Sequence, residues 1–355
     1  MKSELTTPAS NPGTKSEPTL VSSKSHHLVQ MLLSPGGRAF IALAMVLVLG
    51  LIFNADGAFL KTGTHRDTFR QASVYGILAC GMTVVIITAG IDLSVGSVLG
   101  FIAVCFSLMS IHYGLSAWIS IPLCVLIGTV CGAISGTLIA WFKIQPFIAT
   151  LAMMSFARGM AKYVSGGRKI ATAVQNPDGS YRYIDLPQIF RSIDSRILGG
   201  KLAIVTVSFA VCLAIVWIAV ARHRWGRQLF ALGGNEEAAR LSGVPVNWAK
   251  LMAYVTSGML AAVAGICQAA QEQQGDPEAG SGPPGYELTA IAMVVIGGTS
   301  LAGGRGGMGL TLLGILTIGY LEKFLSINAV PEAWRLMATG VIIILAVLTQ
   351  GIKRK

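Results

Sequence analysis

Long apolar stretches separated by short polar connections run along almost the whole chain. A helix of about 17 residues or more can cross the ~30 Å hydrocarbon layer of a membrane, because each residue advances about 1.5 Å. The pattern therefore predicts an all-α polytopic membrane protein with about ten transmembrane helices. The predicted segments are residues 39–59, 72–89, 94–111, 116–142, 147–164, 202–221, 251–270, 287–299, 307–325 and 333–350.

Two of these elements are broken by glycine and carry one isolated charge each. The first surrounds Asp92, in the sequence Gly90-Ile91-Asp92-Leu93-Ser94-Val95-Gly96. The second is the short eighth segment, which leads into Gly303-Gly304-Arg305-Gly306-Gly307 and has the length of a half-helix or a re-entrant segment. One broken element in each half of the chain suggests a faint internal repeat, an arrangement in which discontinuous helices meet at a transport path.

The polar connections suggest an orientation. Residues 1–38 are polar and rich in Ser, Thr and Pro, as expected of a disordered tail, and residues 39–352 form the predicted transmembrane domain. Basic residues cluster in the connection 222–250 and at the terminus 353–355, which ten crossings place on one side. That side is expected to be cytoplasmic. Both termini are then cytoplasmic and the connection 165–200 is periplasmic, whereas a re-entrant eighth segment would separate the termini.

Composition agrees with a membrane protein. The chain is 53% hydrophobic and 12% charged, with a mean hydropathy of +0.65. Its net charge of +11 is spread over tails and short loops, without an arginine-rich face carrying aromatic residues. This distribution indicates charge flanking a membrane rather than nucleic-acid binding. The cysteines lie in apolar segments without metal-ligand spacing, so we expect small buried hydrophobic side chains.

Asp92 is the only charged residue between Arg70 and Lys143. A carboxylate at that depth costs roughly 2.5–3.5 kcal/mol on membrane-insertion scales. Three roles are open: a cap or gate at the broken helix, direct contact with a transported molecule, and ion coupling. The ten-segment pattern places Asp92 and Arg305 near the same inner side, so an ion pair between them is one hypothesis.

The connection 222–250 contains the signals of a short isolated helix. Asn235 can accept hydrogen bonds from the free amides at a helix start, and Glu236 and Glu237 lie where the helix dipole favours anions. Gly243 provides a left-handed stop and Pro245 prevents continuation. A helix of about two turns is unstable alone, so it either docks on another protein or lies on the membrane surface.

Four segments, in order along the chain, carry a resemblance to a known family. Glu237-Ala238-Ala239-Arg240-Leu241-Ser242-Gly243 resembles the E-A-A-x-x-x-G signature of bacterial ABC importer permeases. The segments 90–96, 143–151, 233–240 and 296–306 are similar to the ribose/galactose/arabinose/xylose branch of these permeases. The match runs from about residue 40 to residue 350.

The resemblance implies a subunit of the bacterial inner membrane that dimerises with a second permease subunit. It implies two ATP-binding subunits on the cytoplasmic side and a periplasmic binding protein that delivers a monosaccharide. The coupling helix in contact with the ATPase would be Asn235, Glu236, Glu237, Ala238, Ala239, Arg240, Leu241, Ser242 and Gly243. The broken helices predict a translocation path or gate at Asp92, Ser94, Gly96, Gly297, Gly298, Thr299, Ser300 and Arg305.

The sequence does not predict ATP hydrolysis by this chain. A Walker A loop requires G-x-x-x-x-G-K-[ST], but the single Gly-Lys pair, Gly200-Lys201, is followed by Leu202. His112 has no nucleophile and acid arranged around it in the pattern. We therefore expect no enzyme activity and no cofactor in this chain, with Mg-ATP bound by the partner subunit. The alternative function is an ion-coupled secondary transporter with Asp92 as the ion site.

Two further patterns concern helix surfaces. Gly128, Gly132 and Gly136 recur at every fourth residue of the fourth segment and predict close helix packing. Arg158 and Lys162 lie toward the outer end of the fifth segment. They either extend to the membrane interface or offer hydroxyl-binding donors at the outer mouth.

Overall fold

The computed structural model describes residues 34–175, 179–282 and 285–351. Each of the ten predicted apolar segments overlaps one helix, and the predicted class of helical membrane protein is confirmed. The helices are α2 (Pro35–Ile52), α3 (Thr62–Ile87), α4 (Val95–Ser107), α5 (Ala117–Ala140), α6 (Pro146–Ser165), α8 (Ile204–Arg222), α11 (Val246–Glu272), α12 (Tyr286–Gly297), α13 (Met308–Ile327) and α14 (Glu332–Gly351).

Within the described ranges, seven helices are long and apolar enough to cross a membrane. They are α2, α3, α4 with its continuation to His112, α5, α8, α11 and α13. Helices α6 and α14 have 20 residues each, whereas α12 has only 12, which span about 18 Å. The short eighth segment is thus confirmed. Ten full crossings and the internal repeat stay predictions.

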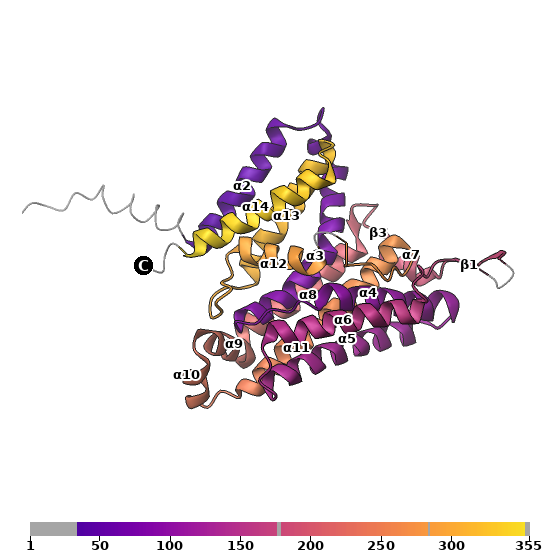
Figure 1. The fold of residues 1–355 in the computed structure, drawn as a ribbon. Coiled ribbons are helices and arrows are strands. Elements are labelled where there is room, and N and C mark those ends of the chain that lie inside the picture. Colours follow the sequence, from indigo (N-terminus) through magenta and orange to yellow (C-terminus); the bar gives the residue numbers. More distant parts are fainter. Residues whose placement is uncertain (1–33, 176–178, 283–284, 352–355) are drawn as a thin grey trace, which may run out of the picture.

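The helices form two groups joined by α3 (Figure 1). One group contains α4, α5, α6 and α11, and the other contains α2, α12, α13 and α14. Helix α3 packs against α11 of the first group and α13 of the second, and its apolar stretch is 83% buried. The two helix breaks belong to different groups, since one follows α3 and precedes α4 and the other separates α12 from α13.

Small residues bring α5 and α11 into close contact. A Cβ atom at Gly132 would collide with the Tyr254 carbonyl, and one at Gly128 with the Gly258 carbonyl. Gly136 likewise lies against the backbone of Leu251. Only hydrogen fits at Gly128 and Gly132, and a Cβ atom at Gly136 would be tight, so the backbones of the two helices approach closely. The predicted packing role of this glycine stripe is confirmed.

The cysteines pack as small apolar side chains. All six are free thiols within helices; five are buried and Cys212 is half-buried. This agrees with the prediction made from their positions in apolar segments.

Short elements cover the two ends of the bundle. At one end lie α9 (Arg224–Gly234) and α10 (Glu236–Leu241). At the other lie α7 (Gln188–Asp194) and two antiparallel hairpins. The hairpin strands are β1 (Ala173–Gln175), β2 (Tyr181–Tyr183), β3 (Arg196–Ile197) and β4 (Leu202–Ala203). Figure 1 draws α9 and α10 at the lower left and α7, β1 and β3 at the right, at opposite ends of the molecule.

The first helix begins four residues earlier than the apolar pattern predicted. The Oγ of Ser34 accepts a hydrogen bond from the amide of Gly37 at 3.0 Å, and Pro35 occupies the first helical position. A serine cap followed by proline is a favourable helix start. Most of the predicted tail and the basic terminus 353–355 lie outside the described residues.

Candidate functional site

Helix α10 forms where the capping residues predict it. The Oδ1 of Asn235 accepts a hydrogen bond from the amide of Ala238 at 3.0 Å, and Glu236 and Glu237 occupy the first turn. Gly243 has a φ of +79° and ends the turn before Pro245. The cap, the acidic first turn and the glycine stop are all confirmed.

One side of α10 is fixed to the rest of the chain. Ala239 is buried with Leu232 of α9 and with Val246 and Ala249 of α11. Glu236 accepts hydrogen bonds from Lys250 at 2.6 Å and from Arg240 at 3.1 Å.

These cations also affect the charge state of Glu236. Partial burial acts to raise its pKa, but the hydrogen bond and charge of Lys250, with the charges of Lys143 and Arg240, outweigh burial and hold the pKa below its usual range. Glu236 therefore stays ionised and holds α10 against α11.

The other side of α10 is exposed in the part of the chain that the structure describes. Leu241 is 81% exposed, and the side chain of Glu237 is 76% exposed. Arg240 and Ser242 are exposed beside them. This surface is polar, with one large apolar side chain, so it lacks the broad apolar face of a helix that lies on a membrane.

The residue two before the Asn235 cap touches both helix breaks. A Cβ atom at Gly233 would collide with the Ile87 carbonyl at the end of α3 and would lie 2.6 Å from the amide of Gly304. That amide donates a hydrogen bond to the Ile87 carbonyl at 2.9 Å. Gly303, with a φ of +78°, packs against Ala89 and the Gly233 carbonyl. We call this set (Ile87, Ala89, Gly233, Gly303 and Gly304) the glycine junction.

Asp92 is buried at the start of α4. Asp92 is only 1% exposed to solvent. Oδ1 accepts hydrogen bonds from the amide of Ser94 at 3.0 Å and from the Ser94 Oγ at 2.6 Å, and Oδ2 accepts one from the Ser257 Oγ at 2.7 Å. Ser257 lies near the middle of α11, which runs from Val246 to Glu272. The break before α4 therefore lies well inside the bundle, with its carboxylate fully hydrogen-bonded.

The hypothesis of an Asp92–Arg305 ion pair is wrong. Both oxygens of Asp92 are occupied by serine groups, and Arg305 is exposed, without a salt bridge within the described part of the chain. The two breaks do meet, but through the backbones of the glycine junction. A sequence pattern that places two loops at one level does not set the directions of their side chains.

The other predicted path residues occupy two places. Ser94 and Gly96 lie at the start of α4, where Gly96 contacts the Glu287 carboxylate. The remaining residues form the turn after α12, in which Gly298 has a φ of +105° and the Ser300 amide donates to the Arg305 carbonyl at 3.0 Å. Gly297 packs on the Leu310 backbone and Thr299 is buried beneath Gly306. These residues therefore shape the helix breaks and do not line one continuous surface.

Sequence reasoning missed Glu287 as a candidate site residue. It is only 9% exposed although it lies in the first turn of α12. An acid at the edge of an apolar segment looks like a flanking charge. The signal that could have identified it is the unusually short helix that follows, since a half-helix starts inside the bundle.

Ion pairs fix the opposite end of the bundle. Arg70 of α3 pairs with Asp194 of α7, and Arg196 pairs with Asp67 at 2.6 Å. Lys169 pairs with Asp276 at 2.8 Å, and this hydrogen bond raises the pKa of Lys169. The described part of the connection 165–200 therefore forms a cap on the helices.

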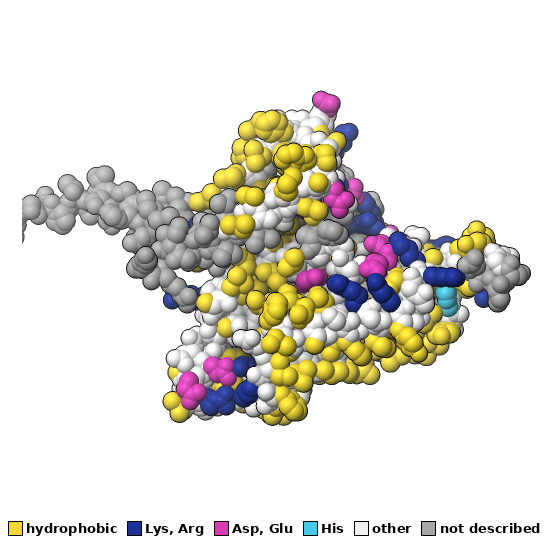
Figure 2. Space-filling model, in the orientation of Figure 1, with side chains coloured by type: hydrophobic (Ala, Val, Ile, Leu, Met, Phe, Trp, Pro, Cys, Tyr) yellow, Lys and Arg dark blue, Asp and Glu magenta, His cyan; other side chains and the backbone are white. Residues whose placement is uncertain are grey.

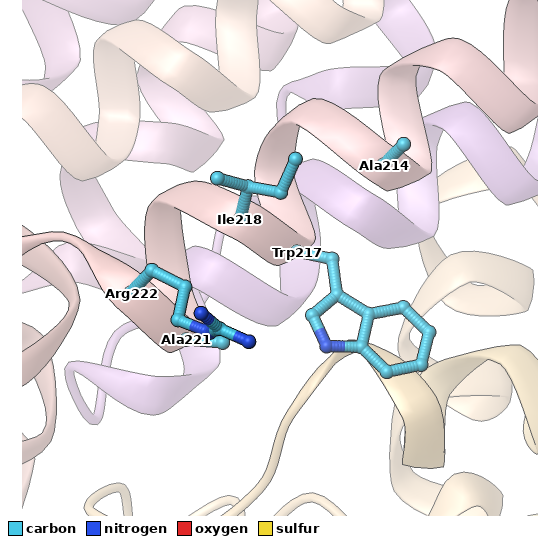
Figure 3. A pocket seen from close by; sticks show the side chains of 5 residues that line it. All are labelled: Ala214, Trp217, Ile218, Ala221 and Arg222. Atoms are coloured by element: carbon cyan, nitrogen blue, oxygen red, sulfur yellow. The ribbon is translucent and has the colours of Figure 1, made fainter.

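A hollow of about 560 Å³ on α8 is unsuited to a polar ligand. Figure 3 shows that its lining comes from this one helix: Ala214, Trp217, Ile218, Ala221 and Arg222. An apolar surface on a membrane helix is the kind that lipid chains cover.

Comparison with known proteins identifies the family. The family model described as branched-chain amino acid transport system / permease component matches residues 66–347. The ribose import permease protein RbsC of Haemophilus influenzae is 39% identical over 88% of this chain and 92% of its own. The fructose import permease protein FruG of Bifidobacterium longum is 34% identical over 87% and 89%. The xylose transport system permease protein XylH of Escherichia coli is 29% identical over 87% and 91%.

No solved structure matches the chain. The relatives are import permeases of the ribose, fructose and xylose type, and they cover nearly all of the described helices. The chain is therefore a transport subunit and not an enzyme. It belongs to the family of ABC sugar-importer permeases.

Proposed function

We propose that this chain is the membrane-spanning subunit of an ATP-driven importer for a monosaccharide of the pentose or hexose class. Two permease subunits, two ATP-binding subunits and a periplasmic sugar-binding protein would form the working complex in the bacterial inner membrane. The family and the sugars in the names of the relatives support this proposal. Mg-ATP would be bound by the partner subunit.

The observation that carries the proposal is the position of α10. Ala239 and Glu236 fix one side of it, Leu241 and Glu237 are exposed on the other, and Gly233 lies against both helix breaks. A partner pressing on the exposed side would move a rigid element directly connected to the glycine junction. This is the geometry expected of a coupling helix, here Asn235 to Gly243, docked on an ATPase.

Transport would proceed by alternating access. ATP binding closes the partner ATPases, and α10 transmits the motion through the glycine junction to the ends of α3 and α12. The predicted path residues act in this scheme as the gate: Asp92 and Ser94 hold the start of α4, and the turn formed by Gly297, Gly298, Thr299, Ser300 and Arg305 ends α12. Gly96, in the first turn of α4, contacts the Glu287 carboxylate.

The arrangement of the ends supports an orientation with α10 in the cytoplasm. Pro35, at the start of α2, packs against Gly298 in the turn next to the glycine junction, and Figure 1 draws the end of α14 near the start of α2. Both termini are then cytoplasmic. The cap of α7 and the hairpins faces the periplasm, where the loaded binding protein docks.

ATP hydrolysis by the reconstituted complex tests the proposal. The permease is combined with its ATP-binding subunits and offered binding proteins loaded with a panel of pentoses and hexoses. We expect at least one loaded binding protein to stimulate hydrolysis several-fold over the empty protein. Hydrolysis that responds to no binding protein, together with uptake on a proton or sodium gradient, would favour the ion-coupled alternative with Asp92 as the ion site.

A further inference from the structure

Glu287, in the first turn of α12, is a buried carboxylate and is 9% exposed. Its Oε2 accepts no hydrogen bond from the residues that the structure describes. Oε2 lies against Gly96 and Oε1 against Gly285, where a Cβ atom on either glycine would collide with the carboxylate. The glycines make room for the group. Burial of a hydrogen-bond acceptor without a donor costs free energy. A ligand whose hydroxyl groups donate to Oε2 would remove that cost and bind favourably here.

Arg158 of α6 faces the same place. Its Nη2 donates to the Ser97 Oγ at 3.4 Å, and its buried Nε has no hydrogen-bond partner in the described ranges. This inward contact is not the extended, interface-seeking arrangement that the sequence left open. Because Gly96 contacts Glu287 and Ser97 contacts Arg158, the two groups approach the same part of α4. They form no ion pair in the described part of the chain, so their charged N and O atoms lie more than 4.0 Å apart. We call the space between them the gap.

A polar cavity lies at the outer end of the bundle, and Glu287, Arg158 and Ser97 are not among its lining residues. This cavity of about 520 Å³ between α3, α11, α12, α13 and α14 reaches Tyr286, the residue before Glu287. Its lining includes Gln268, Glu272 and Arg335, and its volume is in the range of small-molecule sites.

Polar side chains also continue outward along α6. Lys162, one turn beyond Arg158, pairs with Glu278 at 2.7 Å. Figure 2 shows acidic and basic side chains gathered across the middle of this face, between mostly apolar regions above and below. Lys162 and Glu278 are about half exposed, at 50% and 57%, so their pair lies at the surface and outside the buried gap.

We propose that the side chains of Glu287, Arg158 and Ser97 form a site in the translocation path that contacts the sugar. Glu287 accepts hydrogen bonds from neighbouring hydroxyls of a neutral monosaccharide, while Arg158 donates to its oxygens and Ser97 does both. Hydrogen bonds to charged groups are strong. A neutral polyol can donate hydrogen bonds to the carboxylate and accept them from the guanidinium. The proposal rests on the proposed import of a monosaccharide.

The test measures sugar uptake and ATP hydrolysis together in proteoliposomes that contain the complete complex. The variants are Glu287→Gln, Arg158→Gln and Arg158→Lys, and the matched control is Lys162→Gln, which removes a charge from an exposed pair on the same helix. We expect Glu287→Gln and Arg158→Gln to lower the sugar imported per ATP about tenfold. Hydrolysis stimulated by the binding protein stays within about twofold, and Lys162→Gln imports sugar like the natural chain.

Deoxy sugars separate contact from a structural role. With the natural chain, a deoxy sugar that lacks the contacted hydroxyl is taken up less than the full sugar, by a factor similar to the effect of Glu287→Gln. The Glu287→Gln variant takes up this deoxy sugar no less than it takes up the full sugar. If all variants take up every sugar as the natural chain does, the proposed site is wrong. The proposed function would still stand in that case, because the natural chain imports sugar. Absence of uptake by the natural chain would instead refute the proposed function.

A third outcome concerns assembly. If Glu287→Gln separates the two permease subunits in size-exclusion chromatography, then Glu287 meets a donor of the second copy and the proposal is wrong. If Arg158→Gln does not fold, Arg158→Lys keeps the charge and loses the fork of donors. Arg158→Lys is expected to fold and to import less sugar per ATP, and full uptake by it contradicts the assignment.

Discussion

At the scale of single residues, Asp92 shows how hydrogen bonds can give a buried carboxylate a structural role. Its carboxylate accepts three hydrogen bonds from Ser94 and Ser257 and has no cationic partner among the described residues. These bonds connect the start of α4 to α11. Of the three roles that the sequence left open, the contacts favour a cap at the broken helix. A direct sugar contact is not supported, because both oxygens are already bonded.

Substitution of Asp92 tests that role. Asp92→Ala leaves three donors unpaired and is expected to destabilise the protein by about 3 kcal/mol or more. Asp92→Asn keeps an acceptor for Ser94 and is expected to retain uptake within about threefold. Thermal unfolding and uptake measure the two effects. Complete loss of uptake in a stable Asp92→Asn variant would show that the charge itself is required.

The separation of Asp92 from Arg305 gives a second expectation. Because no contact joins the two side chains, the effects of Asp92→Asn and Arg305→Gln on uptake should add within about 0.5 kcal/mol in the double variant. A coupling energy well above that value would support the hypothesis of an Asp92–Arg305 ion pair.

Gly233 is the residue whose substitution tests the glycine junction. A methyl group there collides with the Ile87 carbonyl, whereas one at Gly234 meets nothing within 4 Å. Gly233→Ala is therefore expected to cost about 1–3 kcal/mol in strain and to reduce the coupling between hydrolysis and uptake. Gly234→Ala is the matched control and should behave like the natural chain. Equal coupling in the two variants would show that the junction does not transmit motion.

At the scale of elements, local signals were sufficient for some parts and not for others. The apolar segments, the short α12 and the caps of α10 were predictable because each depends on residues adjacent in the sequence. Contacts between Asp92 and Ser257, or between Gly233 and Ile87, join residues far apart, and no local pattern encodes them. The predicted Asp92–Arg305 pair failed for the same reason. The hairpins of the outer cap are too short to give a repeating pattern.

The attachment of α10 is expected to depend on pH. The pKa of Glu236 is lower in the folded chain than its ordinary value of 4.5, so its contribution is present above that value and is lost as pH falls through the folded pKa. The contribution is small, about 1 kcal/mol or less, because the pair is partly exposed. Thermal unfolding between pH 7 and pH 3 should show a smaller decline for Glu236→Gln than for the natural chain. An identical decline would mean that other groups cause it.

At the scale of the whole molecule, the proposed orientation places α10 and the outer cap on opposite sides of the membrane. Cysteines introduced at Glu237 and Tyr183, both well exposed, test it with a membrane-impermeant thiol reagent. Glu237→Cys should react only from the cytoplasmic side and Tyr183→Cys only from the periplasmic side. The natural cysteines lie within helices and provide a low background. Reaction of both positions from one side would contradict the orientation.

The central claim is that motion of a partner ATPase, delivered through α10, drives the sugar across. The most direct measurement is uptake of a labelled monosaccharide by proteoliposomes that hold the complete complex, with ion gradients collapsed and Mg-ATP supplied or withheld. The account predicts uptake that requires both ATP and the loaded binding protein and is indifferent to the ion gradients. Uptake that continues on a proton or sodium gradient after ATP is exhausted would contradict it.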